Sequence, residues 1–366
     1  MDFEFTPEQE SLRRTVRRWL EEKAPLSFVR RMYSQAEGCS RDVWQAFAEL
    51  GVTGILVPEE HGGAGMAMVD AGVVLEELGR ALFPGPYLVS AVVATRLLEL
   101  LAGPEDRRRL LPGLADGGTI ATVALPLPGR AAQVRAQTSG GEWVLSGSCD
   151  WVPDPFLADL VLVAGRAGGE TLVFVVEAAD AELVPQLTVD GSRRFATLEL
   201  EGTPARPLGT ADASPGLGAA VDCLLTGRVT EGLGTASKAL ELAVDYAKQR
   251  VQFGKPVGAF QSIQHLCADM LQALELGRVG AYYALWAIDG ADPAEAHRGA
   301  TMAMAHASDA FEFVGANCIQ VHGGVGFSWE HDPHLFYKRL LTLQQELGGR
   351  GLHLDELARL VVDRPG

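Results

Sequence analysis

The residues best suited to bind a ligand lie in one short block, Arg250-Val251-Gln252-Phe253-Gly254-Lys255-Pro256, followed by Phe260-Gln261. The guanidinium of Arg250 is a planar fork that matches a pyrophosphate group, whereas a lysine would supply only a point charge. Phe253 offers an apolar face to the edge of an adenine. Gln261 can donate and accept hydrogen bonds to a ribose or an adenine. The block therefore indicates a dinucleotide site.

A second block, Ile319-Gln320-Val321-His322-Gly323-Gly324-Val325-Gly326-Phe327, has complementary properties. Gly323 and Gly324 lack a Cβ, so the backbone can approach a cofactor closely, and Gln320 can add an amide contact. Each feature alone has an ordinary explanation, because Arg250 can end a helix and a Gly-Gly pair can stop one. The two blocks together favour the cofactor site.

The elements that must position these blocks follow from the hydrophobic pattern. Apolar residues recur with a helical period from residue 7 to about 118, starting at the capping pair Thr6-Pro7. Short β-rich runs separated by glycine turns follow to about 212, and the helical period then returns. This order predicts an α+β protein with an N-terminal α-helical domain (1–118), a middle β-sandwich or barrel domain (119–212) and a C-terminal four-helix-bundle-like domain (213–366). The absence of a βαβ alternation disfavours a Rossmann sheet.

Composition excludes several classes of function. The 366 residues include 31 basic and 47 acidic side chains, a net charge of −16, which would repel a nucleic acid. No stretch reaches the ~18 apolar residues of a membrane span, and the acidic start is not a signal peptide. The five cysteines form no CxxC pair, and His331-Asp332-Pro333-His334 lacks a third ligand, so no metal site is expected. These features predict a cytoplasmic protein with free thiols.

The two blocks, in this order behind a helical and then a β-rich half, resemble the acyl-CoA dehydrogenase family. The stretch from Gly51 to Gly65, with Val57-Pro58-Glu59 and Gly62-Gly63, is similar to a loop of the same family. The resemblance covers nearly the whole chain. It implies that FAD is the cofactor and that the Arg250 block reaches FAD bound by a neighbouring subunit.

The β-rich part departs from the family pattern. Trp151 matches the family's aromatic residue beside the flavin, although ordinary core packing is an alternative for it. Pro153 stands where the family has a hydroxyl residue, and proline has no N–H and no side-chain donor. The family's Thr-Glu-Pro-Gly turn is altered to Pro126-Leu127-Pro128-Gly129. Two flavin contacts are thus changed in this chain.

The catalytic base is the least defined part of the resemblance. The family places a glutamate either about 25 residues after the Gly-Gly pair, where this chain has Glu346, or 26 residues before Arg250, where it has Leu224. Glu231 lies seven residues beyond Leu224, on the same helix face, and is a weaker candidate. Such a base needs a dry pocket that raises its pKa. The alternative is that both glutamates are solvated surface residues or helix caps.

The resemblance implies α,β-dehydrogenation of an acyl-CoA thioester, with electrons passed to an electron-transfer flavoprotein. The Phe327-Ser328-Trp329-Glu330-His331-Asp332 stretch and the Leu347-Gly348-Gly349 ending resemble an actinobacterial subfamily that includes partner subunits of heteromeric dehydrogenases. A non-catalytic or half-site subunit is therefore an alternative, and a same-fold flavoenzyme with another reaction, such as nitroalkane oxidation, is a further one. Expected partners are a second copy, as a homodimer or homotetramer, or a related subunit in a heterotetramer. Arg193-Arg194 can meet CoA phosphates, although two arginines at a turn are more often solvated.

Overall fold

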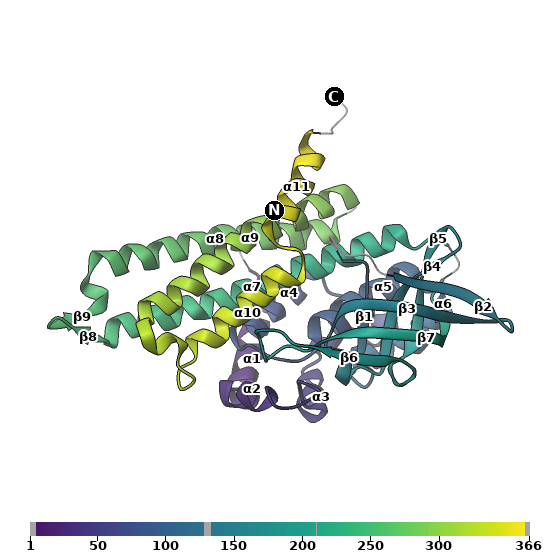
Figure 1. Cartoon of the computed structure of the whole chain (residues 1–366), viewed down its shortest axis with the longest axis horizontal. Coiled ribbons are helices and arrows are strands. Elements are labelled where there is room, and N and C mark those ends of the chain that lie inside the picture. The colour runs from purple at the N-terminus through teal and green to yellow at the C-terminus, as the bar shows by residue number, and fades with distance from the viewer. Residues whose placement is uncertain (1–4, 128–132, 210, 291, 363–366) are drawn as a thin grey trace.

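A computed structural model describes residues 5–127, 133–209, 211–290 and 292–362. Helices form both ends of the chain and strands form its middle (Figure 1). The N-terminal helices are α1 (Pro7–Lys23), α2 (Leu26–Met32), α3 (Arg41–Ala48), α4 (Met68–Arg80), α5 (Thr95–Leu101) and α6 (Pro104–Ala115), with a π-helical stretch at Leu88–Ala94.

The first helix begins where the sequence predicts it. The Thr6 side chain accepts a hydrogen bond from the Gln9 backbone N–H at 3.3 Å, and the Gln9 side chain accepts one from the Thr6 N–H at 3.1 Å. This reciprocal capping box, with Pro7 at the first helical position, satisfies N–H groups that the helix itself cannot pair. The helix start predicted at Thr6-Pro7 is confirmed.

The middle of the chain forms a small closed sheet. Its strands are β1 (Ala121–Ala124), β2 (Gln133–Ser139), β3 (Glu142–Pro153), β4 (Leu160–Ala167), β5 (Glu170–Glu177), β6 (Glu182–Gln186) and β7 (Phe195–Pro207). Because β5 pairs with both β4 and β7, the ring β4-β2-β3-β7-β5 closes, with one residue pair joining β2 to β4. Leu145, Phe174 and Leu198 are among the buried residues that fill it. The predicted β domain between two helical parts is confirmed.

Long helices dominate the C-terminal part. They are α7 (Ser214–Gln249), α8 (Gln261–Asp289), α9 (Pro293–His322), α10 (Pro333–Glu346) and α11 (Gly349–Val362), with a short hairpin, β8 (Val251–Gln252) and β9 (Lys255–Pro256), between α7 and α8. Figure 1 shows this hairpin at the end of the helical arm farthest from the β-barrel. The hairpin tip and the barrel therefore lie at opposite ends of the molecule.

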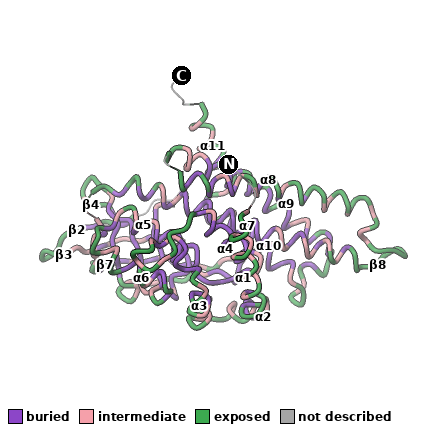
Figure 2. Tube along the Cα trace, turned by 180° about the vertical axis from the view of Figure 1, so that it is seen from behind, coloured by how far each residue is buried: buried purple, intermediate pink, exposed green. Residues whose placement is uncertain are grey.

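Helix α7 crosses α4 at backbone contact distance. A Cβ placed on Gly79 would lie 1.8 Å from the Glu231 carbonyl oxygen, and one on Gly234 would lie 1.8 Å from the Glu76 carbonyl oxygen. Only glycine fits at such a crossing. The crossing buries the middle of α7, which Figure 2 shows running through the interior while the β8 end is exposed. No helix in the described ranges has the length and apolar character needed to cross a membrane.

Candidate functional site

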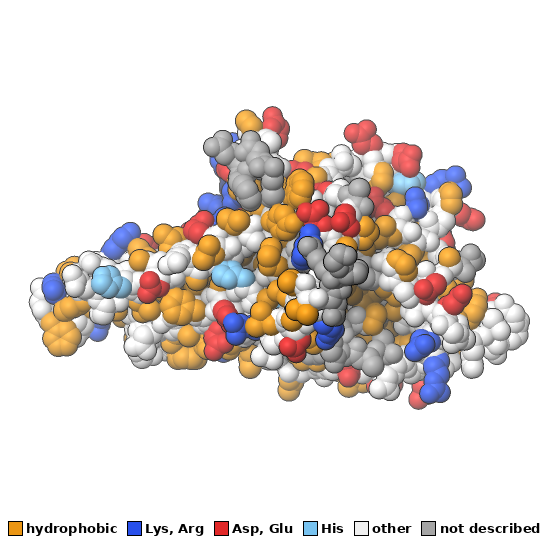
Figure 3. All heavy atoms as spheres, turned by 90° about the horizontal axis from the view of Figure 1, so that it is seen from above, with side chains coloured by type: hydrophobic (Ala, Val, Ile, Leu, Met, Phe, Trp, Pro, Cys, Tyr) orange, Lys and Arg blue, Asp and Glu red, His pale blue; other side chains and the backbone are white. Residues whose placement is uncertain are grey.

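The Arg250 block forms the exposed tip of the helical arm. Arg250 follows the last residue of α7, and its backbone N–H donates to the Tyr246 carbonyl at 2.8 Å. Within the described residues, no carboxylate lies within 4.0 Å of the Arg250 guanidinium, so the cation is unneutralised. Phe253 has φ 54° and is 91% exposed, a costly arrangement for an aromatic residue. Figure 3 shows hydrophobic and basic side chains next to each other at this far end of the arm.

The Gly323 block lies at the same end of the bundle. The His322 ring stacks on the Tyr246 ring with centroids 4.4 Å apart, which brings the end of α9 beside the end of α7. Gln320 is exposed, and Gly323 has φ 63° and ψ −145°, a conformation available in practice to glycine alone. A Cβ at Gly323 or Gly324 would meet nothing within 4 Å, so the backbone there is open to a ligand.

The structure thus brings two distant blocks together into a nucleotide cradle, which we define as Arg250, Phe253, Gln261, Gln320, Gly323 and Gly324. Gln261 starts α8 and is also exposed. An unneutralised guanidinium, an exposed ring and open glycine backbone suit the pyrophosphate and adenine of a dinucleotide. The cradle therefore fits the nucleotide end of FAD.

Trp151 is not part of this cradle. It lies on β3 with φ 60°, and its ring packs against Phe195 with centroids 5.0 Å apart. Trp151 shares a small cavity with Pro153, Leu224 and Glu346, so the predicted aromatic wall lies beside both positions at which the resemblance leads us to expect a base. The remaining lining residues are Val123, Ala124, Leu125, Leu127, Asp150 and Val152. The altered turn of the family pattern continues into Pro128-Gly129, which lie outside the described residues.

This cavity does not fit a flavin ring. Its volume is about 10 Å³, whereas pockets that hold small molecules and cofactors start at about 300 Å³. The Thr122 hydroxyl donates to the Pro153 carbonyl at 2.5 Å and so holds this part of the cavity wall in place. Pro153 itself has no N–H and no side-chain donor to offer a ligand. The two ends of the FAD site are therefore unequal, with an open cradle at the tip and a closed wall at the barrel.

The interior beside this wall is filled by a cluster of seven charged side chains, each no more than 6% exposed. The buried ion cluster consists of Asp154, Asp190, Arg193, Arg228, Glu231, Arg339 and Glu346. Its members come from the residue after β3, the β6–β7 connection, the middle of α7, and the middle and end of α10. The cluster therefore joins the barrel to the helical part.

Glu231 is the centre of the cluster. Its carboxylate pairs with Arg193, with Arg228 Nη1 at 3.0 Å and with Arg339 Nη1 at 2.5 Å. Burial opposes ionisation of Glu231, but the three guanidiniums outweigh it and lower its pKa to about 2. A carboxylate held in this way is a poor proton acceptor. The expectation that Glu231 is a solvated residue or a cap is wrong, because it is 1% exposed.

Glu346 ends α10 and is also 1% exposed. Both Nε and Nη2 of Arg228 donate to its Oε1, at 3.2 and 3.0 Å. Burial raises the pKa of Glu346, and the nearby guanidiniums offset this only in part. The alternative of a solvated Glu346 is wrong, and so is that of a solvated Arg193, which is 6% exposed and pairs with Asp154 at 3.2 Å.

The sequence reasoning missed Arg228, Arg339, Asp154 and Asp190. The sequence did contain one sign of a buried ion pair. Arg228 and Glu231 interrupt the largely apolar stretch from Leu224 to Leu233, and their spacing of three residues puts them on one helix face. Charged residues inside such a run are buried only when they are paired.

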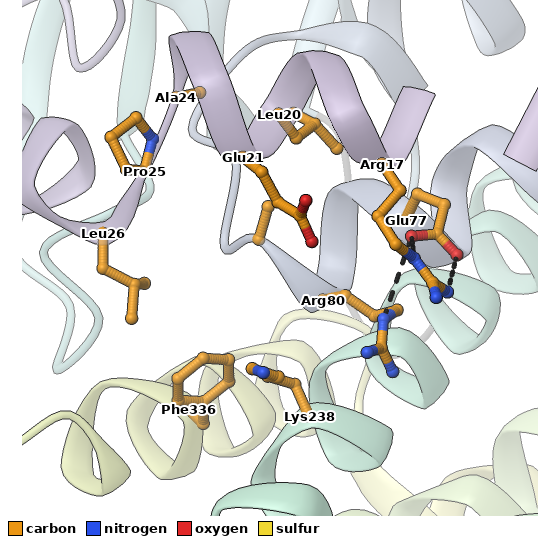
Figure 4. Close-up of a pocket in the computed structure, with 11 residues that line it drawn as sticks. Arg17, Leu20, Glu21, Ala24, Pro25, Leu26, Glu77, Arg80, Lys238 and Phe336 are labelled. Carbon is orange, nitrogen blue, oxygen red and sulfur yellow. Dashed lines mark hydrogen bonds and ion pairs between the residues drawn. The ribbon is translucent and has the colours of Figure 1, made fainter. Parts of the chain in front are cut away.

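A larger cavity of about 230 Å³ lies between α1, α2, α4, α7 and α10 (Figure 4). Arg17 and Arg80 point toward Glu77 at its edge, and Arg17 forms a bidentate pair with that carboxylate at 2.7 Å for both bonds. Glu77 is 1% exposed and belongs to the contact that holds α1 on α4. This cavity lies apart from both the cradle and the ion cluster and is not a candidate for the chemistry.

The helical ends and the central barrel are those of the flavin-dependent acyl-CoA dehydrogenase fold. The chain belongs to the acyl-CoA dehydrogenase family, whose N-terminal domain model matches residues 6–118 and whose C-terminal domain model matches residues 215–362. The chain is 32% identical over 334 residues to the acyl-CoA dehydrogenase IpdE2 of Mycobacterium tuberculosis, covering 91% of this chain and 90% of that protein.

Other relatives point in the same direction. The chain is 33% identical over 370 residues to the acyl-CoA dehydrogenase FadE34 of M. tuberculosis, an alignment that covers 97% of this chain but 48% of FadE34. Among solved structures, the ChsE4-ChsE5 complex of M. tuberculosis superposes with a TM-score of 0.92 at 26% identity, covering all of both chains. A variant of the Tcur3481-Tcur3483 steroid acyl-CoA dehydrogenase superposes with a TM-score of 0.89 at 29% identity, covering 97% of this chain and 98% of that one.

Proposed function

We propose that this chain is the half-site subunit of a heteromeric acyl-CoA dehydrogenase. In this role it supplies the nucleotide cradle for FAD held by a partner chain and does not itself remove the proton from the acyl thioester. The observation that carries the proposal is the contrast between the open cradle at the tip and the closed cavity of about 10 Å³ at the barrel wall. FAD, when bound, supplies the electron acceptor of acyl-CoA oxidation.

The cradle suits a ligand that another chain shares. Its cation, Arg250, and its ring, Phe253, stand on a hairpin that projects from the end of the helical arm. A strained, exposed aromatic residue is retained only where the surroundings use it. The distance between this tip and the barrel wall in Figure 1 means that one chain does not surround a cofactor by itself.

The barrel end argues against catalysis by this chain. An acyl chain is apolar and needs a pocket without unpaired charge, yet the space next to Trp151 and Leu224 leads to the buried ion cluster. Of the two positions where the family has a base, one holds leucine and the other holds Glu346, whose Oε1 is already bonded to Arg228.

Two relatives favour a two-chain assembly. The ChsE4-ChsE5 structure is a complex of two differently named chains, and the chain here matches only about half the length of FadE34. FadE34 is therefore long enough to contain two sets of domains, each the size of this chain. A related second subunit is therefore the expected partner, with acyl-CoA as substrate and an electron-transfer flavoprotein as acceptor of the assembly.

A dehydrogenase complete in one kind of chain is the second candidate, because Glu346 lies on the same cavity as Trp151, as the family's base lies near its flavin wall. Expression of the chain alone and with related chains from the same source separates the two candidates. We expect a colourless lone chain and a yellow complex with less than one FAD per chain. A lone chain that binds one FAD and oxidises a CoA thioester with an artificial acceptor would refute the half-site proposal.

The cradle itself is tested by Arg250→Gln in the complex. Loss of a charge-assisted hydrogen bond to a pyrophosphate costs about 1.5–3 kcal/mol, which corresponds to roughly 10- to 150-fold weaker FAD binding. Lys248→Gln is the matched control, because Lys248 lies in the last turn of α7 and is 71% exposed. Equal FAD affinity in the two variants would contradict the assignment of Arg250.

A further inference from the structure

The buried ion cluster does not balance its charges. It contains three guanidiniums, from Arg193, Arg228 and Arg339, and four carboxyl groups, from Asp154, Asp190, Glu231 and Glu346. If every carboxyl group were ionised, one net negative charge would remain among side chains that are at most 6% exposed. An uncompensated buried charge is costly, and a carboxyl group avoids the cost by binding a proton.

Two of the four carboxyl groups each accept three hydrogen bonds. Glu231 pairs with all three guanidiniums. Asp190 accepts hydrogen bonds from Arg339 Nε at 2.6 Å and from the backbone N–H and hydroxyl of Ser192 at 2.9 and 2.5 Å. A proton on either group would replace several strong donors with a repulsive contact. The extra proton therefore belongs to Glu346 or Asp154.

The two oxygens of Glu346 have different surroundings. Oε1 accepts from two nitrogens of Arg228, as a carbonyl oxygen does, with its two lone pairs. Oε2 lies 3.0 Å from Arg228 Nε but has no hydrogen bond of acceptable geometry among the described residues. Asp154, in contrast, bonds Arg193 Nη1 directly through Oδ2 at 3.2 Å. The Glu346 oxygen is therefore the better place for a proton.

The small cavity beside Glu346 has space for a hydrogen-bond partner of a protonated Oε2. Its volume of about 10 Å³ is close to the minimum for one water molecule, and its walls are mostly apolar. An O–H at Oε2 can donate to a single water there, whereas one water among apolar walls such as Leu224 and Pro153 is poor solvation for an ionised Oε2. Burial raises the pKa of both Glu346 and Asp154, the direction that the charge count requires, so it is the hydrogen bonds that distinguish the two groups.

We propose that the buried ion cluster holds one extra proton at neutral pH and carries it on Oε2 of Glu346. The residue at the position of the family's base is then an uncharged acid that donates a hydrogen bond rather than a carboxylate that accepts a proton. This inference deepens the half-site function proposed above and rests on it, since it gives the physical reason why this chain leaves the chemistry to its partner.

The pH dependence of unfolding tests the proposal on the full chain. A carboxyl group whose folded pKa is raised stabilises the fold at low pH and loses that contribution as pH rises from about 4.5 through the folded pKa. Urea unfolding of the natural chain and of Glu346→Gln is compared from pH 5 to 9. Because glutamine is a neutral isostere, the ratio of their unfolding constants is expected to rise by up to tenfold per pH unit in that window.

Asp154→Asn and Glu241→Gln complete the design. Glu241 lies on α7, is 44% exposed and serves as the control, whose pH profile should match the natural chain. A carbonyl infrared band of a protonated carboxyl group is expected at pH 7.5 in the natural chain and absent in Glu346→Gln. If Asp154→Asn removes the slope and the band instead, or if the natural chain has neither, the assignment to Glu346 is overturned. The flavin content of the complex is unaffected by either result and tests the proposed function separately.

Discussion

Replacement of Glu231 by glutamine removes the anion on which three arginines converge. The side chain is 1% exposed and pairs with Arg193, Arg228 and Arg339. The variant leaves guanidiniums without their shared carboxylate in an interior that water does not reach. Removal of one partner from a buried ion pair costs about 3–5 kcal/mol, because the remaining charge stays buried and unpaired.

The pKa of Glu231 gives an independent magnitude of the same size. A fall from 4.5 to about 2 on folding corresponds to about 3 kcal/mol of stability at neutral pH. Since the folded pKa is depressed, this contribution is present above about pH 4.5 and is lost as pH falls toward 2. The cost of breaking a buried ion pair and the pKa shift of Glu231 both predict that Glu231→Gln lowers the free energy of unfolding by several kcal/mol at pH 7.

Urea unfolding of the lone chain, followed by circular dichroism, measures this loss. The matched control is Glu241→Gln on the same helix, whose carboxylate pairs with Arg80 at 2.8 Å but is 44% exposed. Exposed pairs contribute about 0.2–1 kcal/mol, so the control should change stability little. If Glu231→Gln costs no more than the control, the buried ion cluster does not hold the barrel on the helices as argued.

Two further predictions concern helix contacts. His297 lies 2.8 Å from Asp222 on α7 and 3.5 Å from Glu356 on α11, and the hydrogen bond to Asp222, together with Glu356, raises its pKa despite burial. The hydrogen-exchange protection factors of α11, which compare each rate with the intrinsic rate at the same pH, should therefore fall as pH rises from about 6.5 through that raised pKa, and His297→Gln should abolish this fall. Gly234→Ala should destabilise the chain by more than 1 kcal/mol, because its Cβ would lie 1.8 Å from the Glu76 carbonyl oxygen; Gly218→Ala on the same helix, where a Cβ meets nothing within 4 Å, is the control, and an equal effect on the melting of both would contradict the argument.

The sequence was sufficient for those features that depend on local pattern. The capping box at Thr6 and Gln9 involves residues three apart, and the β-rich runs are separated by turns such as Gly140-Gly141. The residues of the cradle could be predicted because each of its two blocks is contiguous in the sequence. That both blocks lie at one end of the bundle depends on the contact between Tyr246 and His322, which no local pattern shows.

The buried ion cluster could not be predicted from local sequence patterns. Arg339 and Asp190 are 149 positions apart, and Arg228 and Glu346 are 118 apart. Each of these charges, viewed alone, is more often a solvated surface residue. Their burial follows from the crossing of α4 and α7 and from the docking of the barrel, which are properties of the whole fold.

The buried ion cluster has a larger effect on which ligands can enter the interior than on the net stability of the fold. Well-packed hydrophobic residues in place of a buried ion network are often as stabilising, so stability alone does not explain seven buried charges. Their effect is on ligands, because an apolar chain entering beside Leu224 would have to separate Arg228 from Glu346 and bury a guanidinium that has lost one of its hydrogen-bond partners. The same contacts do not extend to the tip, where Arg250 stays open to an anion. Exclusion at one end and access at the other together support the proposed role of a subunit that completes a cofactor site without holding the substrate.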